Sequence, residues 1–394
     1  MKPPKMGSHT IKGGKKVNRE SMLFKKVYGA VAAANIGSAM GAAVEWVSVP
    51  GGGWKAIEDK WGWVEGFLPW IQKERDVRYW NNSPLLHYYH MDMEPGMTED
   101  GAELRYLLTL AIIEKQGRIT VDDFAEEWKK HIKREDIGRL VNPHIRIHYD
   151  RLTCGDELSR IPPRMIGAMT PWPGLVDAPH MIGPIGIINA GDPEQAAYDA
   201  AEVSLILQPA ESGGTESSKV IAAATAAAFA PDATVESIIE ASRAFVSPNT
   251  RGIVDEALDL AAKYPDARAI REPMRQHFMP TYPYADGVET AAEAIALFSL
   301  TKGDVREGMI AATNLGRDTD CIGGMLGPIC GAYKGIDGVP SEWVETVDKA
   351  ILRNSYTVQT IPMLELSEQL YQALLAYRGK MERQCAMLNT LENN

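Results

Sequence analysis

The stretch NLGRDTDCIGGMLGPICGAYKG, residues 314–335, places two acids beside repeated glycines. Asp318 and Asp320 are one residue apart, so their carboxylates repel each other unless a cation, a donor or water is close to them. The small residues that follow predict a helix, and a helix N-terminus favours negative charge. Two interpretations are open: a solvated turn, or a pair of acids that holds a positively charged ligand.

The rest of the chain predicts an all-α fold. Alternating strand patterns are nearly absent, whereas Ala-rich segments with apolar residues three and four apart recur at residues 22–46, 100–117, 194–207 and 288–301. Gly or Pro follows several of these segments, as expected at helix ends. Thr120, with acids just after it, predicts the N-cap of another helix.

Composition excludes some classes of function. The 394 residues carry 41 Lys+Arg and 52 Asp+Glu, a net charge of −11, which argues against sequence-independent binding to nucleic acid. The four cysteines form no CxxC pair and are typical of free thiols in a reducing compartment. No uninterrupted apolar run approaches the roughly 20 residues of a membrane span, and the basic N-terminus has no apolar core. We therefore expect a cytoplasmic protein that does not bind membranes.

The organisation along the chain has three parts. Residues 1–20 are predicted to be a flexible basic tail, residues 21–355 one domain, and residues 356–394 a separate amphipathic helix. Within the domain, residues 46–98 hold six tryptophans among many Gly and Pro, which predicts an extended excursion that could cover a site. The C-terminal helix has an apolar stripe formed by Met363, Leu366, Leu370, Leu374, Tyr377 and Met381. This stripe either packs on its own domain or forms a homodimer contact.

Acids also gather next to small residues at two other places. Glu45 ends a long predicted helix in GSAMGAAVEW, and Thr98, Glu99 and Asp100 precede another helix in GMTEDGAEL. Helix capping by Thr98 and Asp318 explains part of this pattern without any function. Taken together, however, clusters of oxygen ligands without His or Cys at ligand spacing are what Mg²⁺, Mn²⁺ or Ca²⁺ require. Paired carboxylates also suit a site with two metal ions.

Three motifs together resemble those of a known family. GSAMGAAVE, TED and GRDTDCIGGMLGPICGAYKG are similar to the hallmarks of the ADP-ribosylglycohydrolases, which include the dinitrogenase reductase-activating glycohydrolases, and the similarity covers about residues 22–345. The resemblance implies a compact, orthogonally packed all-α single domain with a binuclear Mg²⁺ or Mn²⁺ site. It implies hydrolysis of N- or O-glycosidic bonds of ADP-ribose attached to protein side chains, or of smaller ribosides.

The resemblance also implies roles for individual residues. The metal ligands would be Thr98, Glu99, Asp100, Asp318, Asp320 and Cys321. Glu45 matches an acid that faces the substrate, and either Glu45 or Asp100 would be the catalytic base. Gly183 and Gly186 lie in MIGPIGIINAG, which resembles a Gly-rich segment near the substrate. Tyr282 and Tyr284 either stack on a base or aglycone or pack on the core.

The chain departs from the family pattern at three positions. Glu99 stands where Asp is usual, Ser38 stands where the motif GDAxG has Asp, and Cys321 stands where a Thr or Ser hydroxyl is expected. A neutral thiol is a poor ligand for a hard cation, so that ligand position is vacant or filled by water. Two interpretations follow: a changed metal occupancy, or a substrate other than ADP-ribosylated protein.

These observations lead to one expectation and two rivals. We expect a metal-dependent hydrolase in which metal-activated water cleaves the N-glycosidic bond of a riboside, either an ADP-ribosyl group or a smaller nucleoside-like substrate. The first rival is a non-catalytic module that binds ADP-ribose or a nucleoside through a degenerate metal site. The second is a structural helical protein in which the acids are only helix caps.

Overall fold

The computed structural model describes residues 17–48, 53–69, 93–98, 101–137, 141, 143–155, 161–355 and 357–392. These residues form 18 α-helices and a few 3₁₀ turns, and their only β pairing consists of isolated bridges, so the predicted all-α fold is confirmed. The α-helices in chain order are α1 (Met22–Ser48), α2 (Gly53–Trp61), α3 (Ala102–Lys115), α4 (Val121–His131), α5 (Arg146–Thr153), α6 (Pro163–Ile166), α7 (Asp177–Met181), α8 (Gly183–Ile188), α9 (Pro193–Ser204), α10 (Gly213–Ala227), α11 (Val235–Ala244), α12 (Pro248–Lys263), α13 (Ala267–Phe278), α14 (Gly287–Leu300), α15 (Val305–Leu315), α16 (Thr319–Lys334), α17 (Ser341–Arg353) and α18 (Met363–Glu392).

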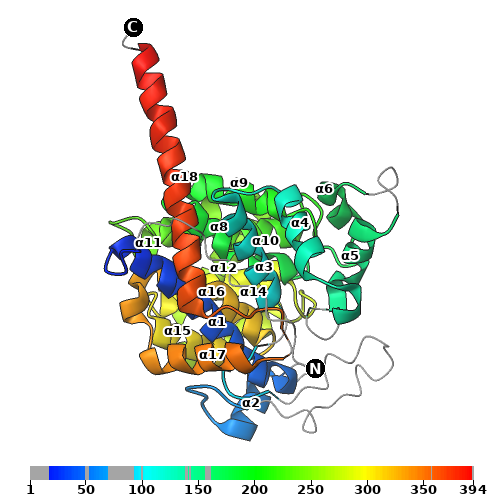
Figure 1. Ribbon diagram of the computed structural model, residues 1–394. Helices are drawn as coiled ribbons and strands as arrows, with labels where there is room; N and C mark the ends of the chain where they lie inside the picture. The colour runs from blue at the N-terminus through cyan, green and yellow to red at the C-terminus, as the bar shows by residue number, and fades with distance from the viewer. Residues whose placement is uncertain are drawn as a thin grey trace.

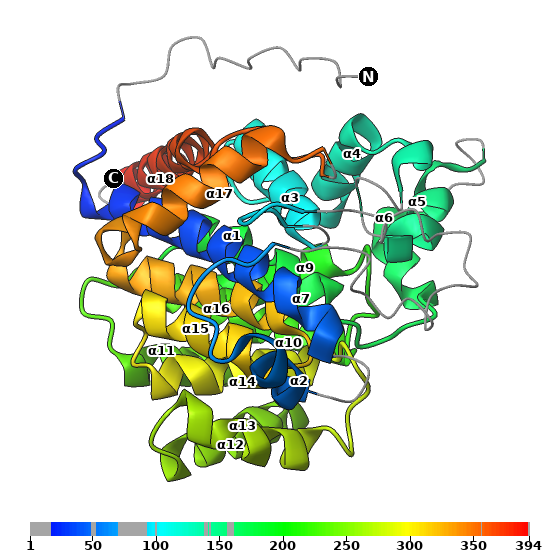
Figure 2. The same cartoon turned by 90° about the horizontal axis from the view of Figure 1, so that it is seen from below.

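Helices α1 and α16 form the centre of the molecule and run antiparallel, side by side (Figure 2). Their backbones touch at glycines. A Cβ atom on Gly37 would lie 2.2 Å from the carbonyl oxygen of Gly323, and one on Gly29 would lie 2.4 Å from the carbonyl oxygen of Gly331. Only glycine fits at such contacts. The repeated small residues of both helices therefore set their close packing and their register.

Other helices surround this central pair. α15, α18 and α3 pack around it, α14 and α10 lie against α16, and α12 and α13 form an outer layer on α14 and α15 (Figures 1 and 2). α1 has the length and composition of a membrane span over Met22–Glu45, but 94% of its most apolar window is buried inside the protein. The sequence criterion of an uninterrupted apolar run does not detect this helix. Its burial among the other helices is that of a core helix.

Local sequence signals explain several helix boundaries. The Thr120 side chain accepts a hydrogen bond from the backbone N–H of Asp123, and the Asp123 carboxylate accepts one from the backbone N–H of Thr120. This capping box starts α4 as predicted. The helices expected at residues 22–46, 100–117, 194–207 and 288–301 are present as α1, α3, α9 and α14.

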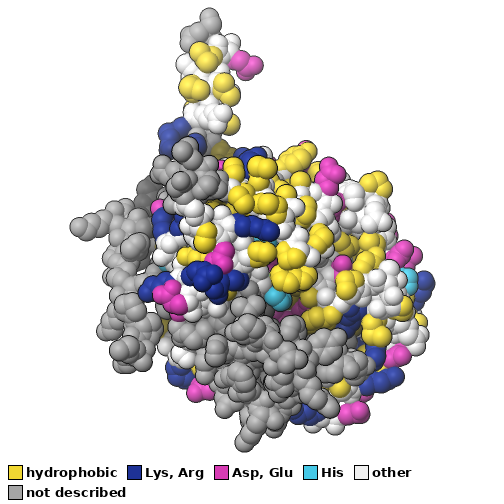
Figure 3. Space-filling model, turned by 90° about the vertical axis from the view of Figure 1, so that its right-hand side faces the viewer, with side chains coloured by type: hydrophobic (Ala, Val, Ile, Leu, Met, Phe, Trp, Pro, Cys, Tyr) yellow, Lys and Arg dark blue, Asp and Glu magenta, His cyan; other side chains and the backbone are white. Residues whose placement is uncertain are grey.

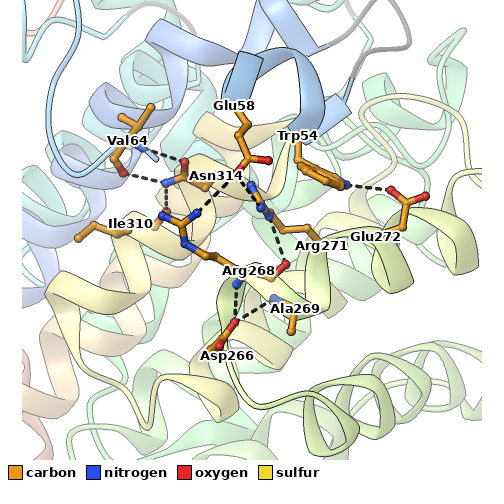
Figure 4. Close-up of polar contacts among 10 residues, drawn as sticks. All are labelled: Trp54, Glu58, Val64, Asp266, Arg268, Ala269, Arg271, Glu272, Ile310 and Asn314. Atoms are coloured by element: carbon orange, nitrogen blue, oxygen red, sulfur yellow. Dashed lines mark hydrogen bonds and ion pairs between the residues drawn. The ribbon is translucent and has the colours of Figure 1, made fainter. Parts of the chain in front are cut away.

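The Trp-rich stretch is not wholly extended, because its residues 53–61 form helix α2. Arg271 of α13 lies 4.1 Å from the ring centroid of Trp54 and pairs with Glu58 at 3.2 Å (Figure 4). Asn314, at the end of α15, bonds both the backbone N–H and the carbonyl of Val64, at 2.9 and 2.7 Å. These contacts hold residues 53–69 against the loop that leads into α16. Residues 70–92 of the stretch lie outside the described residues.

Helix α18 has two different halves. Its first half buries Met363, Leu366, Leu370 and Leu374 against the domain, whereas residues 380–392 are all exposed. The second half stands clear of the body (Figure 1).

Candidate functional site

Three buried acids meet where the C-terminal end of α1 reaches the start of α16. Carboxylate oxygens of Glu45, Asp318 and Asp320 lie within 4.8 Å of one another, and the three side chains are 3–4% exposed. The helix contact brings them together, because a Cβ atom on Gly41 would lie 2.3 Å from the backbone nitrogen of Asp320. The glycine spacing of α1 and α16 thus positions acids that are far apart in the sequence.

The capping interpretation of these residues is wrong. Asp318 occupies the N-cap position of α16, but its side chain makes no capping hydrogen bond. The N-cap of α3 is Gly101 (φ 76°), three residues after Thr98. The Asp318 carboxylate therefore does not cap the start of α16.

The loop that carries Asp318 is fixed from the side of α2. Gly316 has φ 88°, and a Cβ atom there would lie 2.5 Å from the backbone nitrogen of Trp54. Glycine is needed both for this conformation and for this approach. Residues 53–69 therefore help to position the acids.

Tyr284 contacts the site directly. Its hydroxyl donates a hydrogen bond to Oε1 of Glu45. Burial raises the Tyr284 pKa well above its ordinary value, and the nearby carboxylates of Glu45, Asp318 and Asp320 raise it further. The phenol remains a neutral donor that orients Glu45, which is a different contact from the stacking considered from the sequence.

The electrostatics of the cluster favour a bound cation. Burial raises the Asp320 pKa well above its ordinary value, and the charge of Asp318 adds to this. Burial, and then the charge of Asp320, raises the Asp177 pKa to about 7. Within the described part of the chain, Oδ1 of Asp320 is buried without a hydrogen-bond partner. Oxygen ligands in this state fit a divalent cation, which would offset their repulsion and take up the unused lone pairs.

His180 of α7 also belongs to this region, and the sequence reasoning missed it. Its Nδ1 lies 3.3 Å from Sγ of Cys321, and its Nε2 lies 3.0 Å from Oγ of Ser38. Nη2 of Arg105 donates to the same Ser38 hydroxyl at 3.1 Å. All four side chains are buried. Two of the three departures from the family motifs, Ser38 and Cys321, therefore contact one histidine.

Two glycines make room for the His180 ring. A Cβ atom on Gly101 would lie 2.0 Å from Nδ1, and one on Gly324 would lie 2.3 Å from Nε2. The available signal was the single histidine of DAPHMIGPIG, directly before the Gly-rich segment singled out above.

His180 and Cys321 do not form an ion pair of the kind that activates a nucleophilic thiol. Burial, and then Arg105, lowers the His180 pKa well below its ordinary value. Burial, and then Asp318 and Asp320, raises the Cys321 pKa well above its ordinary value. With protein groups alone, both side chains are neutral, whereas a catalytic thiol requires a lowered pKa.

A second acidic group, also missed from the sequence, lies on α14. Glu289 and Glu293 are 2% and 4% exposed, and Nη1 of Arg317 lies 2.7 Å from Oε1 of Glu289. Burial raises the pKa of Glu293 to about 8, while burial and then Glu293 raise that of Glu289 to about 10. Arg317 also donates to the carbonyl oxygens of Tyr282 and Pro283 at 3.2 and 2.8 Å. It thereby ties the Tyr284 loop to the loop of Asp318.

The remaining predicted site residues lie elsewhere or cannot be placed. A Cβ atom on Gly183 would contact Pro328 at 3.1 Å, and one on Gly186 would lie 2.5 Å from Cβ of Thr225, so both glycines serve close helix packing. The ring of Tyr282 packs near Phe278, at 5.9 Å. The substrate-binding roles of these residues stay predictions. Glu99 and Asp100 lie outside the described residues.

Comparison with known proteins decides the family. A sequence model of the family ADP-ribosylglycohydrolase matches residues 19–378.

The chain belongs to the ADP-ribosylglycohydrolase family.

Among curated proteins, this family member is 22% identical to the "Uncharacterized protein YegU" of Escherichia coli (strain K12), over 81% of this chain and 90% of that protein. Among solved structures it is similar to an "ADP-ribosylglycohydrolase-related protein complex", with a TM-score of 0.56 and 18% identity, covering 90% of this chain and 99% of the other. The structural likeness shows the fold. The predicted family resemblance is confirmed, and the ADP-ribosylglycohydrolase family is generally hydrolytic.

Proposed function

We propose that this chain is a hydrolase that uses Mg²⁺ or Mn²⁺ to cleave the N-glycosidic bond of a riboside, either an ADP-ribosyl group or a smaller nucleoside-like substrate. The observation that carries the proposal is the set of buried carboxylates of Glu45, Asp318 and Asp320, within 4.8 Å of one another. Membership of a generally hydrolytic family supports the reaction class.

The chain's own residues have distinct tasks in this reaction. Asp318 and Asp320, with Thr98, Glu99 and Asp100 as further ligands, would hold the metal, and water would take the ligand position that the family's hydroxyl fills. A divalent ion bound there supplies Lewis-acid chemistry, which grips vicinal hydroxyls and lowers the pKa of water. Glu45, held by the Tyr284 hydroxyl, accepts the proton of the attacking water, with Asp100 as the alternative base. The buried carboxylates stabilise the positive charge that develops on the sugar during bond cleavage.

The assay that tests this proposal follows release of ADP-ribose or ribose from ADP-ribosylated protein and from nucleosides. We expect release with Mg²⁺ or Mn²⁺, none with a chelator, and none with Asp318→Asn. Release that survives both chelator and Asp318→Asn would overturn the proposal. Tight binding of ADP-ribose without any product would instead identify the non-catalytic module, for which the loss of the family's hydroxyl at Cys321 is the motivating observation.

We also propose that the protein acts in the cytoplasm on a small or protein-bound riboside, without nucleic acid or membrane partners. The net charge of −11 supports the absence of nucleic acid binding, and four free cysteines, two of them exposed, suit a reducing compartment. Fractionation of cells that express the full chain tests the location. Recovery in a membrane fraction or an oxidising compartment would contradict it.

A further inference from the structure

His180, Cys321 and Asp320 form a second group of ligand atoms, distinct in chemistry from the acid cluster. One ligand atom of each lies within 4.8 Å of the other two, and all three residues are buried. Asp320 belongs to both groups. A carboxylate shared between two sets of ligands is the usual bridge between two metal ions.

We propose that this second group binds a transition metal ion of the Zn²⁺ class, so that the chain holds one hard and one softer ion bridged by Asp320. For its catalytic role this inference rests on the proposed function, but binding of the ion does not.

The distances fit such an ion. With zinc bonds of about 2.3 Å to sulfur and about 2.0–2.1 Å to nitrogen or oxygen, tetrahedral geometry separates sulfur from the other ligand atoms by about 3.5 Å. Sγ of Cys321 lies 3.3 Å from Nδ1 of His180 and 3.6 Å from Oδ2 of Asp320. Three protein ligands leave a fourth position for water or substrate, the usual arrangement of catalytic zinc.

The surroundings of His180 prepare its Nδ1 as a ligand. The Ser38 hydroxyl donates its proton to the carbonyl of Ala34 at 3.1 Å and accepts from Arg105 at 3.1 Å. Because its hydrogen is used in this way, Ser38 accepts from Nε2–H of His180 at 3.0 Å, which leaves the lone pair on Nδ1. A hydrogen bond on the second ring nitrogen is how proteins fix a metal-binding tautomer. Ser38 is therefore a positioning residue.

The softer ligands also explain the departures from the family motifs. A hydroxyl suits a hard ion, whereas a thiolate and an imidazole favour Zn²⁺ and similar ions. Binding requires the thiolate, so Cys321 releases its proton to solvent when the ion enters. Cys321 and Ser38 thus act together: Cys321 is a ligand of the ion, and Ser38 holds the second ligand, His180, in its metal-binding tautomer.

Cobalt absorption tests the proposal without relying on activity. The chelator-treated full chain is titrated with Co²⁺ under reducing conditions, and the thiolate-to-cobalt charge-transfer band is recorded in the near ultraviolet. We expect the band to saturate at one Co²⁺ ion per chain. Zn²⁺ should displace the cobalt and remove the band, whereas excess Mg²⁺ should not. Cys321→Ser and Cys321→Thr should abolish it, while Cys154→Ser, which removes an exposed cysteine, should keep it. Ser38→Ala should weaken cobalt binding about 10–100-fold.

Three results would overturn the proposal: no charge-transfer band, a band that persists in both Cys321 variants, or displacement by Mg²⁺ as efficient as by Zn²⁺. Release of ribose or ADP-ribose, measured on the same samples, separates the two proposals. Hydrolysis without the charge-transfer band would support the proposed function and overturn the transition-metal site. The band without hydrolysis would support the transition-metal site and count against the proposed function.

A separate observation concerns the exposed end of α18, residues 380–392, here called the arm. Met381, Leu388 and Leu391 are 41–68% exposed, and hydrophobic side chains are visible along the free end of the helix (Figure 3). With Leu374 and Tyr377 they follow the heptad spacing of a coiled-coil seam, in which the polar Gln384 holds the position between Met381 and Leu388. An isolated helix of this length is marginal in water.

We propose that the arm pairs antiparallel with the arm of a second copy of this chain. At its base lies a cavity of about 180 Å³ lined by Leu23, Ile188, Ala190, Leu374, Leu375 and Met381. Antiparallel pairing would bring the partner's tip to this cavity. It would also place Glu392 at the tip of one arm near Arg378 at the base of the other, so that opposite charges meet.

Sedimentation of the full chain at several concentrations tests the pairing. We expect a dimer that Leu388→Glu with Leu391→Glu converts to a monomer. Leu352→Glu, which changes an equally exposed leucine on α17, is the matched control and should remain a dimer. In a Cys154→Ser background, a short thiol cross-linker should join two chains through Cys385. A monomeric wild-type chain, or a dimer unaffected by the arm substitutions, would overturn the proposal, as would an arm that binds only vesicles or another protein.

Discussion

Gly37 and Gly323 touch backbone to backbone, with a Cβ atom on either one lying 2.2 or 2.6 Å from the carbonyl oxygen of the other. This contact lies two turns before Glu45 and one turn after Asp318 and Asp320. It therefore sets how closely the acids of two distant segments approach. The packing of the core and the geometry of the site depend on the same glycines.

Gly323→Ala should destabilise the protein by about 1–3 kcal/mol, because the added methyl forces α1 and α16 apart. Urea denaturation measures the change. Gly252→Ala is the matched control, since nothing lies within 4 Å of a Cβ atom there and α12 should gain roughly 0.5–1 kcal/mol. Equal effects of the two substitutions would show that the glycine contact does not control packing.

Asn314→Ala should destabilise by roughly 1–3 kcal/mol, because the N–H and C=O of Val64 lose their shared partner. The same change loosens residues 53–69 from the loop before Asp318. Hydrogen exchange at the Val64 amide should therefore accelerate more than exchange within α14. Unchanged exchange at Val64 would contradict this role of Asn314.

Tyr284→Phe should lower kcat/KM for riboside hydrolysis about tenfold, which corresponds to about 1.4 kcal/mol, because Glu45 loses its oriented donor. Steady-state kinetics with an intact circular dichroism spectrum measures the effect. Tyr198→Phe removes an exposed tyrosine hydroxyl that bonds Glu194 at 3.4 Å and serves as the control. A full rate in Tyr284→Phe would remove Tyr284 from the site.

Glu293→Gln should stabilise the protein more at pH 8 than at pH 5, by about 3–4 kcal/mol. The folded-state pKa of Glu293 is raised from 4.5 to about 8 by burial. Between these values the unfolded chain releases the proton and the folded chain keeps it, so the free energy of unfolding falls as pH rises and levels off above pH 8. Glu293→Gln has no carboxyl group at this position, so its free energy of unfolding does not fall for this reason.

Urea denaturation at both pH values measures the difference between variant and wild type. Glu236→Gln makes the same chemical change at an exposed position and is the control. A variant whose advantage is the same at pH 5 and pH 8 would show that Glu293 is ionised in the folded protein at both.

Several parts of this structure could be predicted from the sequence because their causes are local. Periodic apolar residues indicated α1, α3, α9 and α14, and Thr120 with acids just after it indicated the start of α4. Asp318 and Asp320 were singled out because two carboxylates one residue apart repel each other unless a cation, a donor or water is close, and the family resemblance added Glu45 to the same site. Capping was a plausible rival for Asp318, since the same residue types cap helices and bind metals.

Other features depend on contacts between distant segments. His180 and Cys321 are 141 residues apart, and α7, which carries the histidine, is only five residues long. No periodic pattern marks such a residue. Glu289 and Glu293 follow helical spacing on α14 and resemble surface acids in the sequence, although Arg317 pairs with Glu289 in the interior. Helix α2 was missed because Gly and Pro surround it, while its contacts with α13 hold it in place.

The most direct test of the account is an anomalous diffraction map from crystals of the full chain soaked in Mn²⁺. We predict a manganese peak within bonding distance of the carboxylates of Asp318 and Asp320, next to Glu45, and its loss in Asp318→Asn crystals of the same form. Well-ordered carboxylates with no manganese between them, or a peak that is unchanged in Asp318→Asn, would contradict the account.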